Sequence, residues 1–209
     1  MLNVSWQLVH DKDIMFYQLK WKETTVLYST KQGEAAFLRK FNPILLHQIH
    51  SSTIVDLDRD HKRIGDGMVT RRKNYALGIK VADCLPVYLF NAERICIIHC
   101  GWRSIIRGIA KQASTVMRNY KYILGASIGV CCYEVREDLV ESFSEKYENA
   151  VVSDNQRYFL DLKAAVVKDL GERYLLASLD LCTKCHSEYF YSYRRGDKKR
   201  NYAVILNNM

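Results

Sequence analysis

Prolines are rare in this chain, and long apolar runs do not occur. Only two prolines, Pro43 and Pro86, are found in 209 residues, and no Ser/Gly-rich linker, repeat or low-complexity segment divides the sequence. No stretch of about 18 uninterrupted apolar residues exists, so we expect no membrane-spanning helix. Hydrophobic residues nevertheless make up 48% of the sequence, which is ample for a real core. We therefore expect a single domain over residues 1–209.

The sequence shows neither the pattern of a signal peptide nor that of a disulfide framework. The opening residues, MLNVSWQLVHDKDIMFYQ, are broken early by charge and show no basic segment followed by an apolar one. The seven cysteines are odd in number and unevenly spaced, which is a poor basis for disulfides and fits a reducing compartment. We expect a cytoplasmic protein that does not contact membranes.

The chain carries an excess of positive charge that is spread along the sequence. Lys and Arg number 31 against 23 Asp and Glu, giving a formal net charge of +8, and the one dense cluster is YRRGDKKR at 193–200. A scattered excess is typical of a solvated surface, so we expect no nucleic-acid partner. An anionic small substrate such as phosphate fits the excess equally well.

Hydrophobic patterning predicts a fold that mixes strands and helices. Short β-branched or aromatic runs predict strands at 24–29, 44–50, 53–57, 67–70, 75–81, 85–90 and 94–100. Helical spacing of apolar residues predicts helices over 105–117, 139–147 and 162–170, the last with Asp161 as its N-cap. Later strands are predicted at 123–129, 157–162, 188–193 and 202–206. Strand runs with separated helices indicate an α+β fold.

Three residues of the kind that bind metals stand where predicted strands end. His50 closes ILLHQIH, Cys84 lies in ADCLP between two strands, and His99 closes ICIIH just before a predicted helix. One thiolate and two imidazoles form a sound zinc set, and a catalytic zinc keeps three protein ligands and an open position. The 34 positions between His50 and Cys84 match no local zinc motif. Ordinary strand-end histidines and a buried cysteine are therefore the alternative.

Motifs beside these residues suggest how a substrate would be held. GWRS places Arg103 at a predicted helix start, where arginines and helix N-termini bind oxyanions. GDGMVT contains Asp66 between two glycines, for which a simple turn is the alternative. Asp83 precedes Cys84 and is a candidate proton shuttle, or else the cap of a turn.

The remaining cysteine motifs give a weaker signal. Cys131 and Cys132 are adjacent, and adjacent cysteines rarely bind one metal together, so we interpret them as packing residues. The motif CTKC at 182–185 has the CxxC form, but a structural zinc needs two further ligands and no second pair is evident. We therefore expect no metal there, and a redox role for Cys182 and Cys185 stays open.

Six blocks occur in a characteristic order: HQIHSSTIV, GDGMVT, ALGIKVADCLPVYL, IIHCGWRSIIRGI, SIGVCCYEV and FYSYRRG. Together they resemble the YfiH/laccase-domain family, also called polyphenol oxidase-like. This family includes purine nucleoside phosphorylases with adenosine deaminase activity and bacterial peptidoglycan editing factors. The match runs from about residue 44 to the C-terminus, with a shortened N-terminal region. The resemblance implies an α+β sandwich of mixed β-sheets flanked by helices.

The resemblance also implies the site. His50, Cys84 and His99 match the family's His-Cys-His zinc site, which is both metal centre and catalytic centre. Arg103 would be a nearby substrate or phosphate contact, and other family blocks border the pocket. The candidates for substrate or phosphate binding are therefore Arg103, Asp66, Asp83, Arg194 and Cys131.

The implied function is that of a zinc-dependent purine nucleoside enzyme, a monomer or homodimer. It would phosphorolyse adenosine, inosine or methylthioadenosine, using phosphate, and deaminate adenosine. The alternative is a peptidoglycan-precursor editing hydrolase with Cys84 as nucleophile and His99 as base. A copper-dependent polyphenol oxidase needs a trinuclear cluster, which the six histidines of the chain cannot build, although copper could occupy a His₂Cys set in vitro. A purely structural zinc normally takes four protein ligands.

Overall fold

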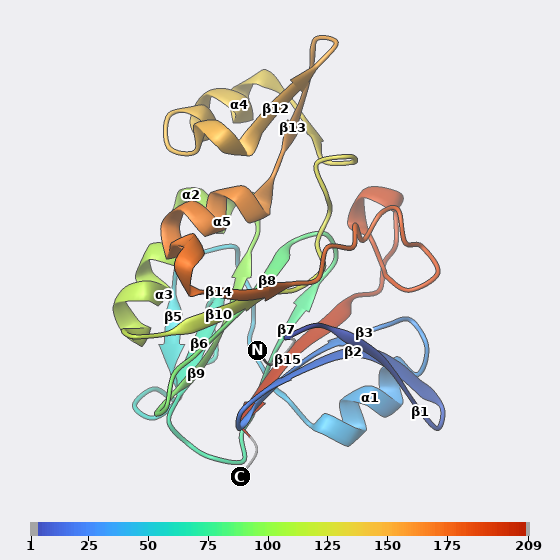
Figure 1. The fold of residues 1–209 in the computed structure, drawn as a ribbon, viewed down its shortest axis with the longest axis vertical. Helices are drawn as coiled ribbons and strands as arrows, with labels where there is room; N and C mark the ends of the chain where they lie inside the picture. Colours follow the sequence, from blue (N-terminus) through green and yellow to red (C-terminus); the bar gives the residue numbers. More distant parts are fainter. Residues whose placement is uncertain (1–3, 208–209) are drawn as a thin grey trace.

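Two six-stranded mixed sheets lie face to face at the centre of the fold (Figure 1). The computed structural model describes residues 4–207. The first sheet has the order β1 (Gln7–Asp11), β2 (Ile14–Trp21), β3 (Thr24–Ser29), β15 (Asn201–Asn207), β7 (Ala76–Val81) and β4 (Ile44–Leu45). The second has the order β14 (Leu175–Ser178), β10 (Lys121–Leu124), β8 (Leu85–Phe90), β9 (Ile95–Cys100), β6 (Gly67–Thr70) and β5 (Ile54–Asp56). The predicted α+β sandwich is confirmed.

Helices cover the outer faces of both sheets (Figure 1). Helix α1 (Glu34–Phe41) lies on the first sheet, where Phe37 packs against Phe16 and Leu27. The second sheet is covered by α2 (Trp102–Ile106), α3 (Ile109–Met117) and α5 (Leu162–Leu170). Helix α4 (Glu137–Ser144) and a small sheet of β11 (Glu134–Val135), β13 (Arg157–Leu160) and β12 (Val151–Asp154) project from one end of the molecule.

Strands β8 and β9 are buried on both faces, which explains their nearly continuous apolar sequences. Side chains alternate across a strand, so Val87 and Ile98 pack under the helices. Tyr88 and Ile97 point the other way, into the layer between the two sheets. No helix within residues 4–207 has the length and apolar character needed to cross a membrane.

Several predicted elements match the structure closely, and others do not. The strands predicted at 24–29, 67–70 and 85–90 and the helix at 162–170 have the predicted bounds. The helix predicted over 105–117 is wrong as one element, because the chain turns at Gly108, whose φ is +81°, and forms α2 and α3 instead.

The strand predicted at 188–193 is wrong. This aromatic segment forms turns and ends in a short 3₁₀ helix at Tyr193–Arg195. Its aromatic content reflects packing, since Phe190 is fully buried against Tyr28. The strand predicted at 44–50 stops at Leu45, and the one at 123–129 stops at Leu124, in both cases giving way to loops that build the site.

The N-cap of α5 provides a test of the local fold. The Asp161 carboxylate accepts hydrogen bonds from the backbone N–H groups of Lys163 and Ala164, at 2.9 and 3.0 Å. We expect Asp161→Ala to lower the free energy of unfolding by about 1 kcal/mol, measured by urea denaturation. Asp161→Asn is the matched control, because its amide oxygen keeps the acceptor. Equal destabilisation by both variants would contradict the capping role.

Candidate metal centre and its pocket

The structure brings His50, Cys84 and His99 together from three elements. His50 lies in the loop after β4, Cys84 in the turn between β7 and β8, and His99 in β9. One nitrogen of each imidazole and the Cys84 sulfur all lie within 4.8 Å of one another. The two imidazole rings have centroids 4.9 Å apart and meet edge to face. These side chains could share one metal ion.

The buried carboxylate of Asp66 positions both histidines. It accepts a hydrogen bond from Nδ1 of His99 at 2.9 Å, which leaves Nε2 of that ring directed at the cluster. The same carboxylate accepts the backbone N–H groups of Ile49, His50 and Ser51, and the Ser51 hydroxyl. His50 has a φ of +56°, a conformation that non-glycine residues rarely adopt, so these bonds stabilise an otherwise unfavourable turn.

Arg107 and Gly101 also contribute to the arrangement of the cluster. The Arg107 guanidinium donates to the backbone carbonyl of His50 at 2.7 Å. Gly101 lies against the ligands, and a Cβ atom there would come within 3.0 Å of the Cys84 sulfur and 3.2 Å of the His50 ring. Glycine at this position therefore allows the start of α2 to approach Cys84 and His50.

The three side chains and Asp66 form a strongly coupled set of charges. Burial would raise the pKa of the Cys84 thiol, but the positive charge of His99 and hydrogen bonds from both imidazoles lower it to about 6. Burial would lower the pKa of His99, whereas the Cys84 thiolate and the Asp66 carboxylate raise it to about 9. Without a metal, the site thus holds a thiolate beside an imidazolium at neutral pH. Metal binding would release the His99 proton.

The cluster opens into a pocket of about 560 Å³ that carries positive charge. Lys80, Arg103 and Arg200 line it together with the three candidate ligands. The Arg103 guanidinium stacks on the ring of Trp102, 4.3 Å from its centroid, which keeps its donors available on the pocket side. The pocket therefore combines a metal-binding cluster with groups that bind an anion.

Sequence reasoning missed several pocket residues. Lys80 and Arg200 both line the pocket, as do His47, Gln48 and Tyr193. Lys80 is the exposed position in an otherwise buried stretch of β7, so a lone lysine in the run GIKV was an available signal. Gln48 exchanges two hydrogen bonds of 2.8 Å with the Lys80 backbone and so holds the His50 loop to β7.

Asp66 lies behind His99 and outside this lining, and so do three other predicted site residues, Asp83, Arg194 and Cys131. Both oxygens of the Asp83 carboxylate accept hydrogen bonds of 2.7 Å from the C-terminal loop, one from the Thr183 hydroxyl and one from the Arg194 N–H. The Arg194 side chain faces a neighbouring pocket of about 660 Å³, stacks on Tyr133 and donates to the carbonyl of Glu134. That pocket also contains Trp102, so it adjoins the first one.

The third of these residues, Cys131, belongs to a separate group of four cysteines. Its sulfur lies with those of Cys132, Cys182 and Cys185, and all four are within 4.8 Å of one another. The sequence suggested no second pair of ligands for the CxxC motif at 182–185. The structure supplies one from the adjacent cysteines at 131 and 132.

The two-sheet fold and the His-Cys-His cluster together define a laccase-domain protein. The chain belongs to the family described as multi-copper polyphenol oxidoreductase laccase, whose model matches residues 22–206.

The chain is similar to proteins named as purine nucleoside phosphorylases. One from Clostridium acetobutylicum is 30% identical over 179 residues, covering 77% of this chain and 75% of that protein. Another, from Aquifex aeolicus, is 29% identical over 161 residues, covering 73% and 76%. Among solved structures, the hypothetical protein YfiH of Bacillus licheniformis superposes with a TM-score of 0.80 at 20% identity, covering 96% of this chain and 99% of that one. This structural likeness shows the fold alone.

The lowered pKa of Cys84 predicts an unusual pH profile of alkylation. In chelator-treated protein, iodoacetamide should modify Cys84 with a midpoint near pH 6, whereas an ordinary cysteine titrates near pH ~8.5. The rate at each pH is measured by peptide mass spectrometry, which separates Cys84 from the other cysteines. His99→Ala removes the charge that favours the thiolate, so its midpoint should move upward. An unchanged midpoint in that variant would contradict the ion pair.

Proposed function

We propose that this chain is a zinc-dependent purine nucleoside phosphorylase. The observation that carries the proposal is the single pocket in which His50, Cys84 and His99 lie beside Lys80 and Arg103. Phosphorolysis needs a phosphate anion to be held, and the negative charge on the departing purine to be stabilised, as the purine leaves C1′ of the ribose. The purine nucleoside phosphorylases among the relatives support the same reading.

The donor set fits zinc. One thiolate and two imidazole nitrogens are ligands that zinc accepts, and three protein ligands leave a position open toward the pocket. Asp66 behind His99 completes the carboxylate–histidine arrangement that commonly supports a metal ligand. When bound, a zinc ion supplies a Lewis acid that stabilises negative charge on a neighbouring substrate atom.

The cationic side chains of the pocket would bind phosphate. Arg103 offers a planar set of donors, already oriented by Trp102, that matches two phosphate oxygens. Lys80 would add a compact positive charge from β7. One phosphate oxygen would form the new bond to C1′ as the bond from C1′ to the purine nitrogen breaks, and the purine would leave with a proton.

The adjoining pocket has the character needed for a purine ring. Trp102 and Tyr133 offer aromatic faces, and Arg194 stacks on Tyr133 with its guanidinium 5.0 Å from the ring centroid. Flat aromatic and guanidinium groups stack well on nucleobases. The ribose would then lie between the two pockets, next to Trp102, which lines one, and Arg103, which lines the other.

Adenosine deamination is the second reaction that we propose for the site. Water would replace phosphate as the nucleophile and attack C6 of the purine, and ammonia would leave. This reaction needs the purine, rather than the ribose, next to the three ligands. The phosphate-binding side chains would therefore contribute less to deamination than to phosphorolysis.

The thiolate–imidazolium pair favours one alternative, a peptidoglycan-precursor editing hydrolase. In that reaction Cys84 would attack an amide carbonyl, and His99 would give its proton to the leaving amine. Water would then hydrolyse the thioester and free the Cys84 thiol. Copper oxidation of phenols is disfavoured, because within residues 4–207 only one group of three or more metal-binding side chains contains histidine. A trinuclear copper cluster would need further histidines grouped around it.

A product assay on the wild-type protein and a Cys84 variant tests the proposed site. Wild-type protein should release adenine from adenosine only when phosphate is present, and inosine should appear through deamination. In Cys84→Ala both products should fall to the level of the protein-free reaction, because three ligands leave no redundancy. Chromatography that resolves adenine, inosine and hypoxanthine measures both reactions at once.

The control for that assay is Cys96→Ala, which removes a buried thiol outside the pocket and should retain both reactions. Phosphate-dependent release of adenine by Cys84→Ala would contradict the proposed site. Hydrolysis of an amide-bearing muropeptide by wild-type protein, with no turnover of nucleosides, would favour the hydrolase instead.

Arg103→Ala tests the phosphate site. A charge-assisted hydrogen bond contributes about 1.5–3 kcal/mol, so the KM for phosphate should rise by about 10- to 100-fold, with a smaller effect on deamination. Arg59→Ala is the matched control, because the Arg59 side chain is 83% exposed and does not line the pocket. Equal loss of both reactions in Arg103→Ala would show that this side chain contacts the nucleoside rather than phosphate.

A further inference from the structure

The group of four cysteines joins two loops that are distant in sequence. Cys131 and Cys132 follow β10, whereas Cys182 and Cys185 precede β15. Burial does not account for the grouping, since Cys131 and Cys185 are exposed to solvent. Exposed thiols seldom gather in fours for the sake of packing alone, so the arrangement needs another cause.

The distances between the sulfurs match those around a tetrahedral metal ion. With Zn–S bonds of about 2.3 Å, the sulfurs of a tetrahedral site lie about 3.8 Å apart. The Cys185 sulfur is 3.7 Å from that of Cys131 and 3.4 Å from that of Cys132, and all four sulfurs lie within 4.8 Å. A disulfide would need about 2.05 Å, and the cysteines are all free.

The backbone around Cys182 is arranged for a negatively charged sulfur. The N–H of Gly129 donates to the Cys182 sulfur at 3.2 Å, and the backbone amides of Lys184 and Cys185 also donate to it. Amide donors on the first cysteine of a CxxC turn favour its thiolate, which is the form that binds a metal. This local geometry comes from the turn at 182–185 and from the loop after β10.

We propose that Cys131, Cys132, Cys182 and Cys185 form a second zinc site, distinct from the His50–Cys84–His99 cluster. Four protein thiolates close the coordination sphere, so the site is structural and has no open position for a substrate. The proposal does not depend on the function proposed for the first site.

The position of the second site indicates what it stabilises. Thr183 lies between Cys182 and Cys185, donates its hydroxyl to Asp83, and bonds through its N–H to the carbonyl of Ser127 at 3.0 Å. Asp83 is the residue before Cys84. A zinc ion at the second site would therefore fix the turn at 182–185, which in turn holds Asp83 next to Cys84 of the first site.

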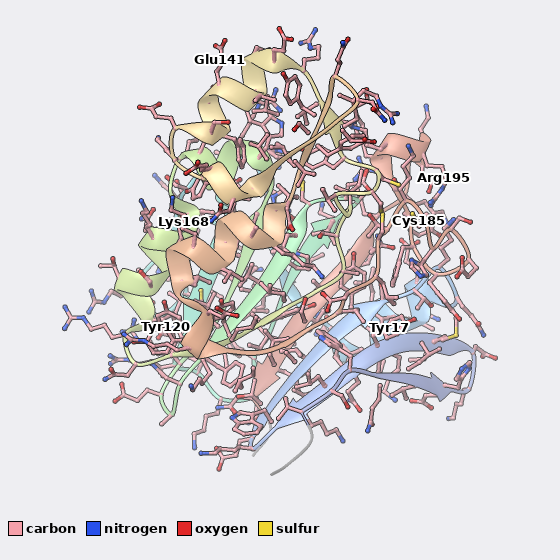
Figure 2. The ribbon with its side chains drawn as sticks, turned by 45° about the horizontal axis from the view of Figure 1, so that its top comes forward. Tyr17, Tyr120, Glu141, Lys168, Cys185 and Arg195 are labelled. Carbon is pink, nitrogen blue, oxygen red and sulfur yellow. The ribbon has the colours of Figure 1, made fainter. Side chains whose placement is uncertain are left out.

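The turn at 182–185 also supports the segment that lines the pockets. The Arg195 guanidinium donates to the carbonyls of Thr183 and Lys184, at 3.1 and 2.9 Å. Figure 2 shows Cys185 and Arg195 next to each other in the loop ahead of β15. Arg195 follows Tyr193 and Arg194, which line the two pockets. Loss of the second zinc should consequently loosen the loop over 182–196.

Zinc counting tests the proposal directly. Protein purified under reducing conditions and analysed by native and elemental mass spectrometry should hold two zinc ions per chain. Cys185→Ser and Cys132→Ser should each hold one, and so should Cys84→Ala, which affects only the first site. Cys96→Ala is the control and should keep two. A full count of two in Cys185→Ser would overturn the second site.

Cobalt replacement provides a test that does not need a variant of the second site. In Cys84→Ala protein loaded with Co²⁺, the four thiolates should give strong sulfur-to-cobalt charge transfer and the intense visible bands of a tetrahedral ion. Weak octahedral bands, or an intact mass that shows disulfides in place of a metal under the same reducing conditions, would refute the proposal. Absence of nucleoside turnover would leave both zinc results unchanged, so the two proposals fail separately.

Hydrogen exchange then tests the structural role. Selective loss of the second zinc should increase exchange of backbone amides over 127–133 and 182–196, while the amides of β8 and β9 stay protected. Unchanged protection of both loops after loss of that zinc would contradict the bracing role.

Discussion

One buried carboxylate organises the site. Asp66 is completely buried, and it binds the backbone on both sides of His50 as well as the ring of His99. Burial raises the pKa of a carboxyl group, but the hydrogen bonds from His99 and Ser51 keep that of Asp66 at about 2, so it stays ionised. The same group thus fixes the ring orientation of one ligand and the backbone conformation of another. Asp66 therefore couples the positions of the two histidines.

The sequence singled out the three candidate metal ligands together with Asp66 and Arg103, but not the other residues that line the pocket. His50, Cys84 and His99 stand at ends of apolar runs, and the order of the family blocks connects them. The lone lysine in GIKV marks Lys80 as exposed, but its proximity to Arg200 depends on how β7 and β15 pair across the first sheet. For Asp83 the sequence left a proton shuttle or a turn cap open, and the structure favours the turn, since both carboxylate oxygens bind the C-terminal loop.

The fold was predictable where the pattern of apolar residues is clear. Strand β8 is a continuous apolar run and helix α5 has apolar residues at helical spacing, and both have the predicted bounds. The segment at 188–193 has the composition of a strand, yet it forms a loop, in which Phe190 packs into the core between the sheets. The backbone N–H groups of Tyr189 and Phe190 both donate to the His186 carbonyl rather than to a neighbouring strand. The N-terminal hairpin of β1 and β2 was not predicted, since β1 is largely exposed and lacks a clear apolar alternation.

Strand β15 occupies the middle of the first sheet, between β3 and β7. Its contacts span 173 positions to Ser29 and 120 positions to Val81. Pairings so remote in sequence close large loops, so this part of the sheet should be a slow step in acquiring the native topology. Until β15 inserts, β3 and β7 present unpaired backbone to solvent, which exposes the nascent chain to association with other copies. Strand β15 therefore joins the two halves of the first sheet, and its late insertion should lengthen the time during which the chain can aggregate.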